Sequence, residues 1–421
     1  MQTIVGTLLL VMLMIGGSEA TGAAQQSQTA TAPAQDTDPA AGLVPEPRVI
    51  SRAVDFASPW LGRDNASPRD GFYPDFGDMV TGAGWMSGGP GYRQHFLDGH
   101  LLVDGSAAIS TRAYKDAQGR IELTDLGGKH ATLGFQVRGQ DLTQVNYFGI
   151  GPNSSESQRS EYRLRETDLQ GYGTVRANGW LSFGGRFGWV KQPTLSSSVG
   201  PFDRDDPNAL VEFPTDPGMA AQTNLLYGGA TIVADMRDYP SHPTRGGVYR
   251  AAAYAYADRE FHQFGFRRYE AEGLQILPIA GERWVLALHG WGVFSDTSAN
   301  NSVPFYMLPS LGGANTLRGY NDYRFHDRQM LLASAESRWA LFTHVDAAAF
   351  VDAGNVAARV GDLNLDKTSY GGGLRVHTRT STLARLDVAH SREGWRVILN
   401  LSDPFRLARR SLRTSVIPFV P

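Results

Sequence analysis

Cysteine is absent from this chain of 421 residues. That absence excludes disulfides, thiolate metal ligands, a cysteine nucleophile and a cysteine-linked lipid anchor. Charge is also sparse: only 19% of the residues are Asp, Glu, Lys or Arg, and the net charge is −3. The chain therefore lacks the basic surplus that would indicate nucleic-acid binding. With an ordinary apolar fraction of 42% and no long apolar run after the N-terminus, a polytopic helical membrane protein is excluded as well.

The first 70 residues predict an exported protein. An apolar run from Ile4 to Ile15 is followed by small residues up to Ala20, which is typical of a signal peptide over residues 1–20, although no Lys or Arg precedes the run. An uncleaved membrane anchor is the alternative interpretation. Residues 21–70 begin with a stretch rich in Ala, Gln, Thr and Pro that has no hydrophobic periodicity, so we expect a disordered periplasmic leader.

Alternation of apolar and charged residues dominates the rest of the chain. From about residue 71, segments of about 9–14 residues end at Gly, Pro, Asn or Asp, which is typical of strands. In the last five segments the charges share one face, as in Leu331, Ala333 and Ala335 against Glu336 and Arg338. The charges that we expect to line an interior are Arg338, Arg375, Arg385, Asp387 and Arg396.

Such alternation is compatible with a soluble sandwich or with a transmembrane barrel. In a barrel the apolar face meets lipid and the charged face lines the lumen. The export signal, the low charge and the 48 glycines favour the barrel. Because every backbone polar group must be paired in lipid, the sheet has to close. The sequence therefore predicts an all-β fold, a transmembrane antiparallel β-barrel of about 16 strands over residues 71–405.

The lengths of the connections predict the orientation of the barrel. Short ones such as Lys115–Gly119 and Pro278–Glu282 are expected to be periplasmic turns. Long ones near Gln192–Asn224 and Ser295–Arg328 are expected to be extracellular loops. With both termini in the periplasm, the second long connection lies between strands 11 and 12 and is the sixth extracellular loop.

Motifs in and after the sixth loop carry a resemblance to a known family. The loop contains Leu317-Arg318-Gly319-Tyr320, the next strand carries Glu336, and the strand after it reads Phe350-Val351-Asp352-Ala353-Gly354. Together with the turn Pro243-Thr244-Arg245-Gly246, this order resembles the BamA/TamA superfamily of outer-membrane barrels, also called the bacterial surface antigen family. The resemblance implies that the sixth loop folds back into the lumen.

Two carboxylates are expected to meet an arginine inside the barrel. By the phase of their strands, Glu336 and Asp352 point into the lumen from neighbouring strands, where the planar fork of a guanidinium can bridge both. The resemblance assigns this role to Arg318 and gives a structural loop lock of Arg318, Gly319, Tyr320, Glu336 and Asp352. The alternative is that Arg318 is a solvated loop residue.

The resemblance implies insertion or translocation of proteins, or of lipids, at the outer membrane of a Gram-negative-type bacterium. The POTRA repeats usual in the family do not occur in the leader, so the chain resembles the POTRA-less branch. A passive or plugged pore and an outer-membrane hydrolase on a barrel scaffold are the alternatives. No G-x-S-x-G or H-E-x-x-H motif occurs, so we predict no catalytic residue, cofactor or metal, and we interpret His289 and His377 as polar groups of the lumen or rim. The expected partners are outer-membrane lipid and a protein substrate or periplasmic partner, with a monomeric barrel and no nucleic acid.

The C-terminus departs from the family pattern. The last strand of the family ends the chain at an aromatic residue, which Phe405 matches, but residues 406–421 follow it. This tail carries four arginines and no acidic residue, and its last residues are apolar. We expect it to dock at the periplasmic mouth or on a partner, or to supply Phe419 as the residue recognised during assembly; a passive disordered tail is the alternative.

Overall fold

The computed structural model describes residues 44–61, 70–77, 86–199, 207–220, 223–401, 403–405 and 407. The chain divides into two compact units, Met1–Asp38 and Pro39–Pro421, and all described residues belong to the second. The predicted signal peptide over residues 1–20 and nearly all of the tail over residues 406–421 lie outside the described residues. These two expectations therefore stay predictions.

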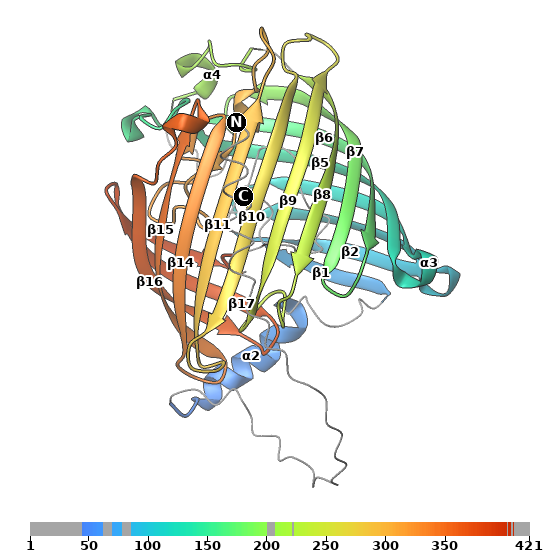
Figure 1. Cartoon of the computed structure of the whole chain (residues 1–421), viewed down its shortest axis with the longest axis vertical. Helices are drawn as coiled ribbons and strands as arrows, with labels where there is room; N and C mark the ends of the chain where they lie inside the picture. Colours follow the sequence, from blue (N-terminus) through green and yellow to red (C-terminus); the bar gives the residue numbers. More distant parts are fainter. Residues whose placement is uncertain are drawn as a thin grey trace, which may run out of the picture. The chain divides into compact units, whose positions relative to one another are not determined.

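Sixteen strands form one antiparallel sheet in the order of the sequence. Figure 1 shows the arrangement of its strands. They are β1 (Gly71–Gly77), β2 (Ser87–Phe96), β3 (Leu101–Ser110), β4 (Lys115–Asp125), β5 (Ala131–Tyr147), β6 (Ser160–Arg176), β7 (Leu181–Ser196), β8 (Asn224–Asp235), β9 (Gly246–Asp258), β10 (Phe266–Pro278), β11 (Trp284–Asp296), β14 (Gln329–Ala340), β15 (Val345–Ala357), β16 (Lys367–His377), β17 (Thr382–Ser391) and β18 (Gly394–Asn400). A second sheet pairs β12 (Ser310–Leu311) with β13 (Phe325–His326) inside the connection from β11 to β14. The predicted number of about sixteen strands is confirmed, and the motif-bearing loop lies between the eleventh and twelfth strands, as expected.

Burial alternates along the strands as the charge pattern predicted. In β14, Glu336 and Arg338 are buried, while the residues between and beside them are more exposed. The opposite face carries large apolar side chains that remain exposed, such as Val351, Leu386 and Val397. Many of the largest fully buried side chains of the described residues are arginines. This distribution reverses that of a soluble protein and fits a charged lumen inside a lipid-facing wall.

The connections agree with the predicted loops but not with one predicted turn. Residues 197–223 join β7 to β8, residues 297–328 join β11 to β14, and Pro278–Glu282 lies at the turn between β10 and β11. The prediction of a turn at Lys115–Gly119 is wrong, because these residues begin β4. The chain turns earlier, at residues 111–114, where Ala113 adopts the left-handed conformation with φ of 60°. Gly119 instead lies in the ladder opposite Gly105.

The two edge strands, β1 and β18, are not joined by a ladder in the part of the chain that the structure describes. The expected closure of the sheet is therefore not seen there. Both strands have only seven residues, and β1 carries Pro74 directly opposite Pro90 of β2. Proline offers no N–H to a ladder. The pairing of β2 with β3 is likewise interrupted at Gly89 and Pro90.

Of the predicted disordered leader over residues 21–70, residues 21–43 and 62–69 lie outside the described residues, and a helix in the described part contradicts the expectation there. Residues 48–61 form α2 (Arg48–Leu61), which contacts β1 and β17. Val54 is buried, and Ile50 and Ala57, at helical spacing from it, are half-buried. The apolar face of this short helix is the physical reason for the order found there.

The remaining helices are single turns at the strand connections. They are η1 (Leu97–Gly99), α3 (Leu126–Lys129), η2 (Glu156–Gln158), α4 (Ala209–Glu212), η3 (Phe305–Met307) and η4 (Val360–Asp362). Figure 1 shows α2 and α4 at opposite ends of the sheet. Of the helices in the described residues, none is long and apolar enough to span a bilayer.

Candidate functional site

The sixth loop, residues 297–328, packs against the inner face of the sheet. Gly312 and Gly313 have φ of 116° and 99°, which glycine adopts without strain, and they allow the chain to reverse after β12. Leu311, Leu317 and Phe325 of the loop are fully buried in a cluster with residues of the flanking strands. The expectation that this loop folds into the lumen is confirmed.

Arg318 joins two carboxylates of the wall and is 1% exposed. Its Nη1 donates to Glu336 Oε2 at 2.5 Å, and its Nε and Nη2 donate to the two oxygens of Asp352 at 2.9 and 2.8 Å. The guanidinium also stacks on Phe350, with 3.4 Å between Cζ and the ring centroid. Bidentate charge-assisted hydrogen bonds of this kind fix the orientation of the guanidinium as well as its position.

Glu336 is shared by three guanidinium groups. Besides Arg318, it accepts from Arg338 at 2.8 Å and from Arg375 at 2.8 Å. Arg338 continues the network to Asp403, at 3.0 Å. Because a buried carboxylate is stable only when it is paired, Glu336 is the centre that holds this group of charges together.

Asp387 extends the same network along β16 and β17. It accepts from Arg375 Nη1 and, at 2.9 Å, from Arg385 Nη1. Arg385 also donates to the loop, at Ala314 O and Asn315 Oδ1. The network thus contains equal numbers of opposite charges: Arg318, Arg338, Arg375 and Arg385 with Glu336, Asp352, Asp387 and Asp403. Arg396 lies apart from these ion pairs and donates to Asn321 of the loop.

Gly319 and Tyr320 serve packing rather than charge. A Cβ at Gly319 would lie 2.8 Å from the Cβ atoms of Ser369 and Ser391, so only glycine lets the loop approach the wall this closely. Ser391 Oγ donates to Gly319 O at 2.8 Å. Tyr320 is buried and packs on Phe325, with 5.2 Å between the ring centroids. All five residues of the predicted lock therefore lie in one buried region, and its role as a lock stays a proposal.

Arg324 is a loop residue that the sequence did not single out. Its Nε donates to Glu393 in the turn between β17 and β18 at 2.9 Å, and its Nη1 and Nη2 donate to Ser154 in the connection between β5 and β6, each at 2.8 Å. Burial raises the pKa of Glu393 above its ordinary value, against the opposing charge of Arg324. Arg324 thus joins the loop to two parts of the wall that are distant in the sequence. No motif around Arg324 in the sequence indicates this role.

The C-terminal segment departs from its predicted place. We expected Phe405 to end the last strand, but β18 ends at Asn400 and Phe405 is 5% exposed. Phe405 and Leu407 pack in a cluster with inward-facing apolar residues of β9, β10 and β11, namely Val248, Leu274, Ile276, Val285 and Ala287. Asp403 holds the segment through Arg338. The chain leaves the sheet after β18 and enters the lumen because a hydrophobic patch there receives Phe405.

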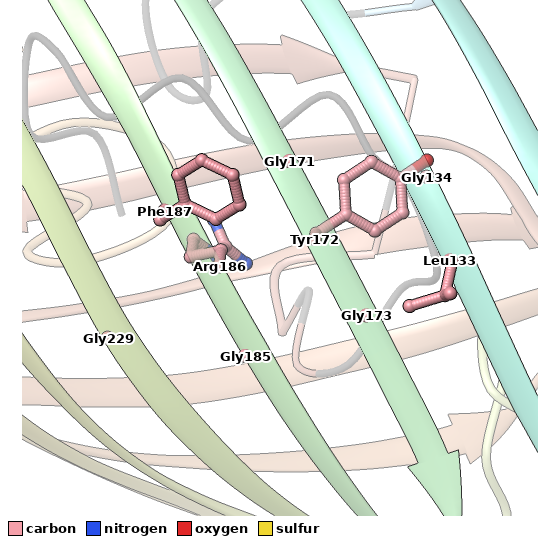
Figure 2. Close-up of a pocket in the computed structure, with 9 residues that line it drawn as sticks. All are labelled: Leu133, Gly134, Gly171, Tyr172, Gly173, Gly185, Arg186, Phe187 and Gly229. Atoms are coloured by element: carbon pink, nitrogen blue, oxygen red, sulfur yellow. The ribbon is translucent and has the colours of Figure 1, made fainter.

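A hollow in the wall lies over β5, β6, β7 and β8, as Figure 2 shows. It is lined by Leu133, Gly134, Gly171, Tyr172, Gly173, Gly185, Arg186, Phe187 and Gly229. Aromatic rings cover three of these glycines. A Cβ at Gly134 would lie 2.2 Å from the Tyr172 ring, one at Gly171 would lie 2.9 Å from the Phe187 ring, and one at Gly229 would lie 2.1 Å from the Tyr254 ring. Rings that cover glycines of a neighbouring strand stabilise strand pairing. The hollow therefore reflects how glycine and aromatic residues pack in this wall.

The fold and this interior define a class of protein, an outer-membrane β-barrel with a charged lumen that holds its own long loop. The sequence model of the Omp85 superfamily domain matches residues 110–392, more than half of the chain, and the chain belongs to the Omp85 superfamily.

Two solved structures with TM-scores of 0.50 or more share this fold. BamA from Haemophilus ducreyi lacking POTRA domains 1–3 matches with a TM-score of 0.59 and 16% identity, over 79% of this chain and 70% of that chain. CdiB from Escherichia coli matches with a TM-score of 0.50 and 12% identity, over 80% of this chain and 63% of that chain. CdiB from Acinetobacter baumannii gives a TM-score of 0.47 and 14% identity, over 79% and 59%. A comparison with curated proteins finds no match.

Proposed function

We propose that this protein inserts or translocates polypeptide, or lipid, at the outer membrane, and that it does so at the seam between β1 and β18. The observation that carries the proposal is that these two short edge strands lack a shared ladder in the described residues. An edge strand presents unpaired backbone donors and acceptors to which another strand can add. Membership of the Omp85 superfamily supports the proposal. That the protein acts without POTRA domains stays a prediction from the sequence.

Two prolines without an N–H donor weaken the pairing of β1 with β2, so we expect β1 to be the more mobile side of this seam. Pro74 and Pro90 face each other, so neither can donate a hydrogen bond where β1 meets β2. The interrupted pairing at Gly89 and Pro90 weakens the next ladder as well. We infer that β1 and β2 can separate from a substrate strand, or bend to receive one, at lower cost than a regular hairpin.

The buried loop supports a lumen that stays obstructed while the seam works. In this proposal Arg318, Glu336 and Asp352 are the lock that keeps the sixth loop in the lumen. Phe405 and Leu407 occupy the inner face of β9 to β11 at the same time. Loop and C-terminal segment together obstruct the lumen, with both termini on the periplasmic side.

A photo-crosslinking residue placed at the seam tests the proposal. Phe72 of β1 and Phe187 of β7 are matched positions, because both are outward-facing phenylalanines that are 86% and 73% exposed. Crosslinks from position 72 to newly made outer-membrane proteins, with only lipid captured from position 187, are expected. Depletion of the protein should then lower the amount of those proteins in the outer membrane. Equal capture from both positions, or an unchanged outer-membrane proteome, would contradict the proposal.

A plugged pore is the second candidate, favoured by the occupied lumen. Planar-bilayer recordings separate the two functions. We expect the unmodified protein to conduct little, since the loop and the C-terminal segment fill the interior. A steady, large conductance in the absence of any substrate would favour a pore over an insertase.

A further inference from the structure

A second buried cluster lies at the end of the sheet opposite the sixth loop. It consists of His242 in the connection between β8 and β9 (residues 236–245), Asp346 at the start of β15 and His377 at the end of β16. All three residues are buried, and their potential ligand atoms lie within 4.8 Å of one another. His377 Nε2 lies 3.1 Å from Asp346 Oδ1, and His242 Nε2 lies 3.5 Å from Asp346 Oδ2.

The hydrogen-bond partner of each Nδ1 atom indicates whether that nitrogen carries a proton. His377 Nδ1 lies 2.9 Å from the backbone oxygen of Thr378, which can only accept, so Nδ1 carries the proton and donates. His242 Nδ1 lies 3.2 Å from Thr382 Oγ1, whose own proton is directed to Asp403 Oδ2. Both Nε2 atoms therefore face oxygens of the Asp346 carboxylate. A buried carboxylate is stable only when it is paired with a cation, and a metal ion held by both imidazoles can be that cation.

We propose that His242, Asp346 and His377 bind one divalent transition-metal ion, of the class to which Zn²⁺ belongs. Two imidazoles and one carboxylate form a donor set that suits such an ion, with a fourth position left for water. The hydrogen bonds at both Nδ1 atoms are the outer contacts that orient metal-bound histidines. The cluster shares no residue with the Arg318 lock or with β1 and β18, so the inference goes beyond the proposed function.

The geometry requires a small movement on binding. The two rings stack, with 3.8 Å between centroids and 12° between planes, so each imidazole has to turn about its Cβ–Cγ bond to direct its lone pair at a shared ion. Donor atoms around a tetrahedral ion with bonds of about 2.0 Å are separated by about 3.3 Å. Each Nε2 is already near this distance from one oxygen of Asp346, at 3.1 Å from Oδ1 for His377 and at 3.5 Å from Oδ2 for His242.

The position of the cluster gives the ion a structural consequence. β10, β11 and β14 separate β9 from β15 in the sheet, so the connection that carries His242 has to reach past them. A bridge between Ser241 and Ser381 and the bond from Thr382 N to Ser241 O already place it there. A bound ion would therefore cross-link two distant parts of the wall at the end predicted to face the periplasm.

Metal binding to the full chain in detergent micelles, stripped with a chelator, tests the proposal. We expect one Co²⁺ per chain with the visible absorption of a four-coordinate ion, displaced by Zn²⁺, and a higher thermal midpoint with Zn²⁺. His242→Gln and Asp346→Asn should each weaken binding more than tenfold. His289→Gln is the matched control, since His289 is also a buried histidine of the wall, paired with Glu272 at 2.9 Å.

Two results would overturn the proposal. They are the absence of saturable 1:1 binding by the unmodified chain, and equal affinities for His242→Gln and His289→Gln. If His242→Gln fails to give a folded barrel, Asp346→Asn decides alone, because it keeps the shape of the side chain and removes only its charge.

Discussion

Removal of the Arg318 side chain is the sharpest test of the interior network. Arg318→Ala deletes the three side-chain hydrogen bonds to Glu336 and Asp352. Glu336 keeps Arg338 and Arg375, each at 2.8 Å. Asp352 keeps only Ser369 Oγ at 3.1 Å and the backbone N–H of residue 318, so in the described residues it loses its cation. The cost therefore falls on Asp352.

Breaking a buried ion pair from one side costs about 3–5 kcal/mol, since it leaves an uncompensated charge. A cost of this size shifts the equilibrium between docked and undocked loop by a factor between about one hundred and a few thousand. Arg318→Ala should thus fold into a barrel with a lower thermal midpoint and a sixth loop that proteases cut. Adding Asp352→Asn should recover part of the loss, because it removes the orphaned charge.

The assay combines heat-modified mobility on gels with limited proteolysis of residues 297–328. Arg396→Ala is the matched control, because Arg396 also touches the loop from the wall but donates to the neutral amide of Asn321. The control should lose much less thermal stability and protease resistance than Arg318→Ala, because it leaves no carboxylate of the network without its cation. An Arg318→Ala protein with an unchanged midpoint and an intact loop, or a double variant no better than the single one, would refute the reasoning.

Three further expectations concern the ends and the orientation of the chain. Phe405→Ala should lower the thermal midpoint, because removing a buried phenylalanine side chain costs about 3–5 kcal/mol. Phe135→Ala, on the outer face, is the control and should not lower the midpoint. Equal midpoints for the two variants would place Phe405 outside the lumen. A cysteine at the exposed Ser197 should react with an impermeant maleimide on intact cells, and labelling only after lysis would invert the topology. Burial raises the pKa of Glu46, but the hydrogen bonds from Ser51 and His344 together outweigh burial, so the pKa is lowered. The stabilising hydrogen bond from His344 N to the Glu46 carboxylate is therefore fully present above pH 4.5 and is lost as the pH falls through the lowered pKa. Proteolysis before α2 should rise in acid, and Glu46→Gln should show the same susceptibility at neutral pH.

Strand number, strand faces and the place of the sixth loop could be predicted because period-2 alternation reports them directly. In a wall embedded in lipid, charged side chains at every second position can face only the lumen. Arg375 and Asp387 were therefore expected to face the lumen. The turn at Lys115–Gly119 was wrong because glycine in a strand and glycine in a turn look alike in sequence. Here Gly119 pairs with Gly105 inside the sheet.

Contacts between distant segments could not be predicted. Nothing in the spacing of His242, Asp346 and His377 relates them, because they meet only when the connection after β8 passes β10, β11 and β14. The inward path of Phe405 likewise depends on a patch formed by β9 to β11. Local pattern predicts which way a side chain faces, and the three-dimensional path of loops decides what it meets.

The hydrogen bonds that hold the sixth loop to the wall are distributed unevenly around the sheet. This distribution indicates which side of the seam could move. On the side of β18, the sixth loop is held by Arg385, Ser391 and Arg396 of the last two strands, and by Glu393 in the turn between them. On the side of β1, Tyr73 donates a hydrogen bond to Asp104 of β3, within the same three-stranded edge. A displacement of β18 would have to break several loop contacts, whereas a displacement of β1 and β2 meets a ladder already interrupted at Pro90. If the seam admits a substrate strand, the β1 side is therefore the one expected to move, while β18 remains fixed to the loop as the template for pairing.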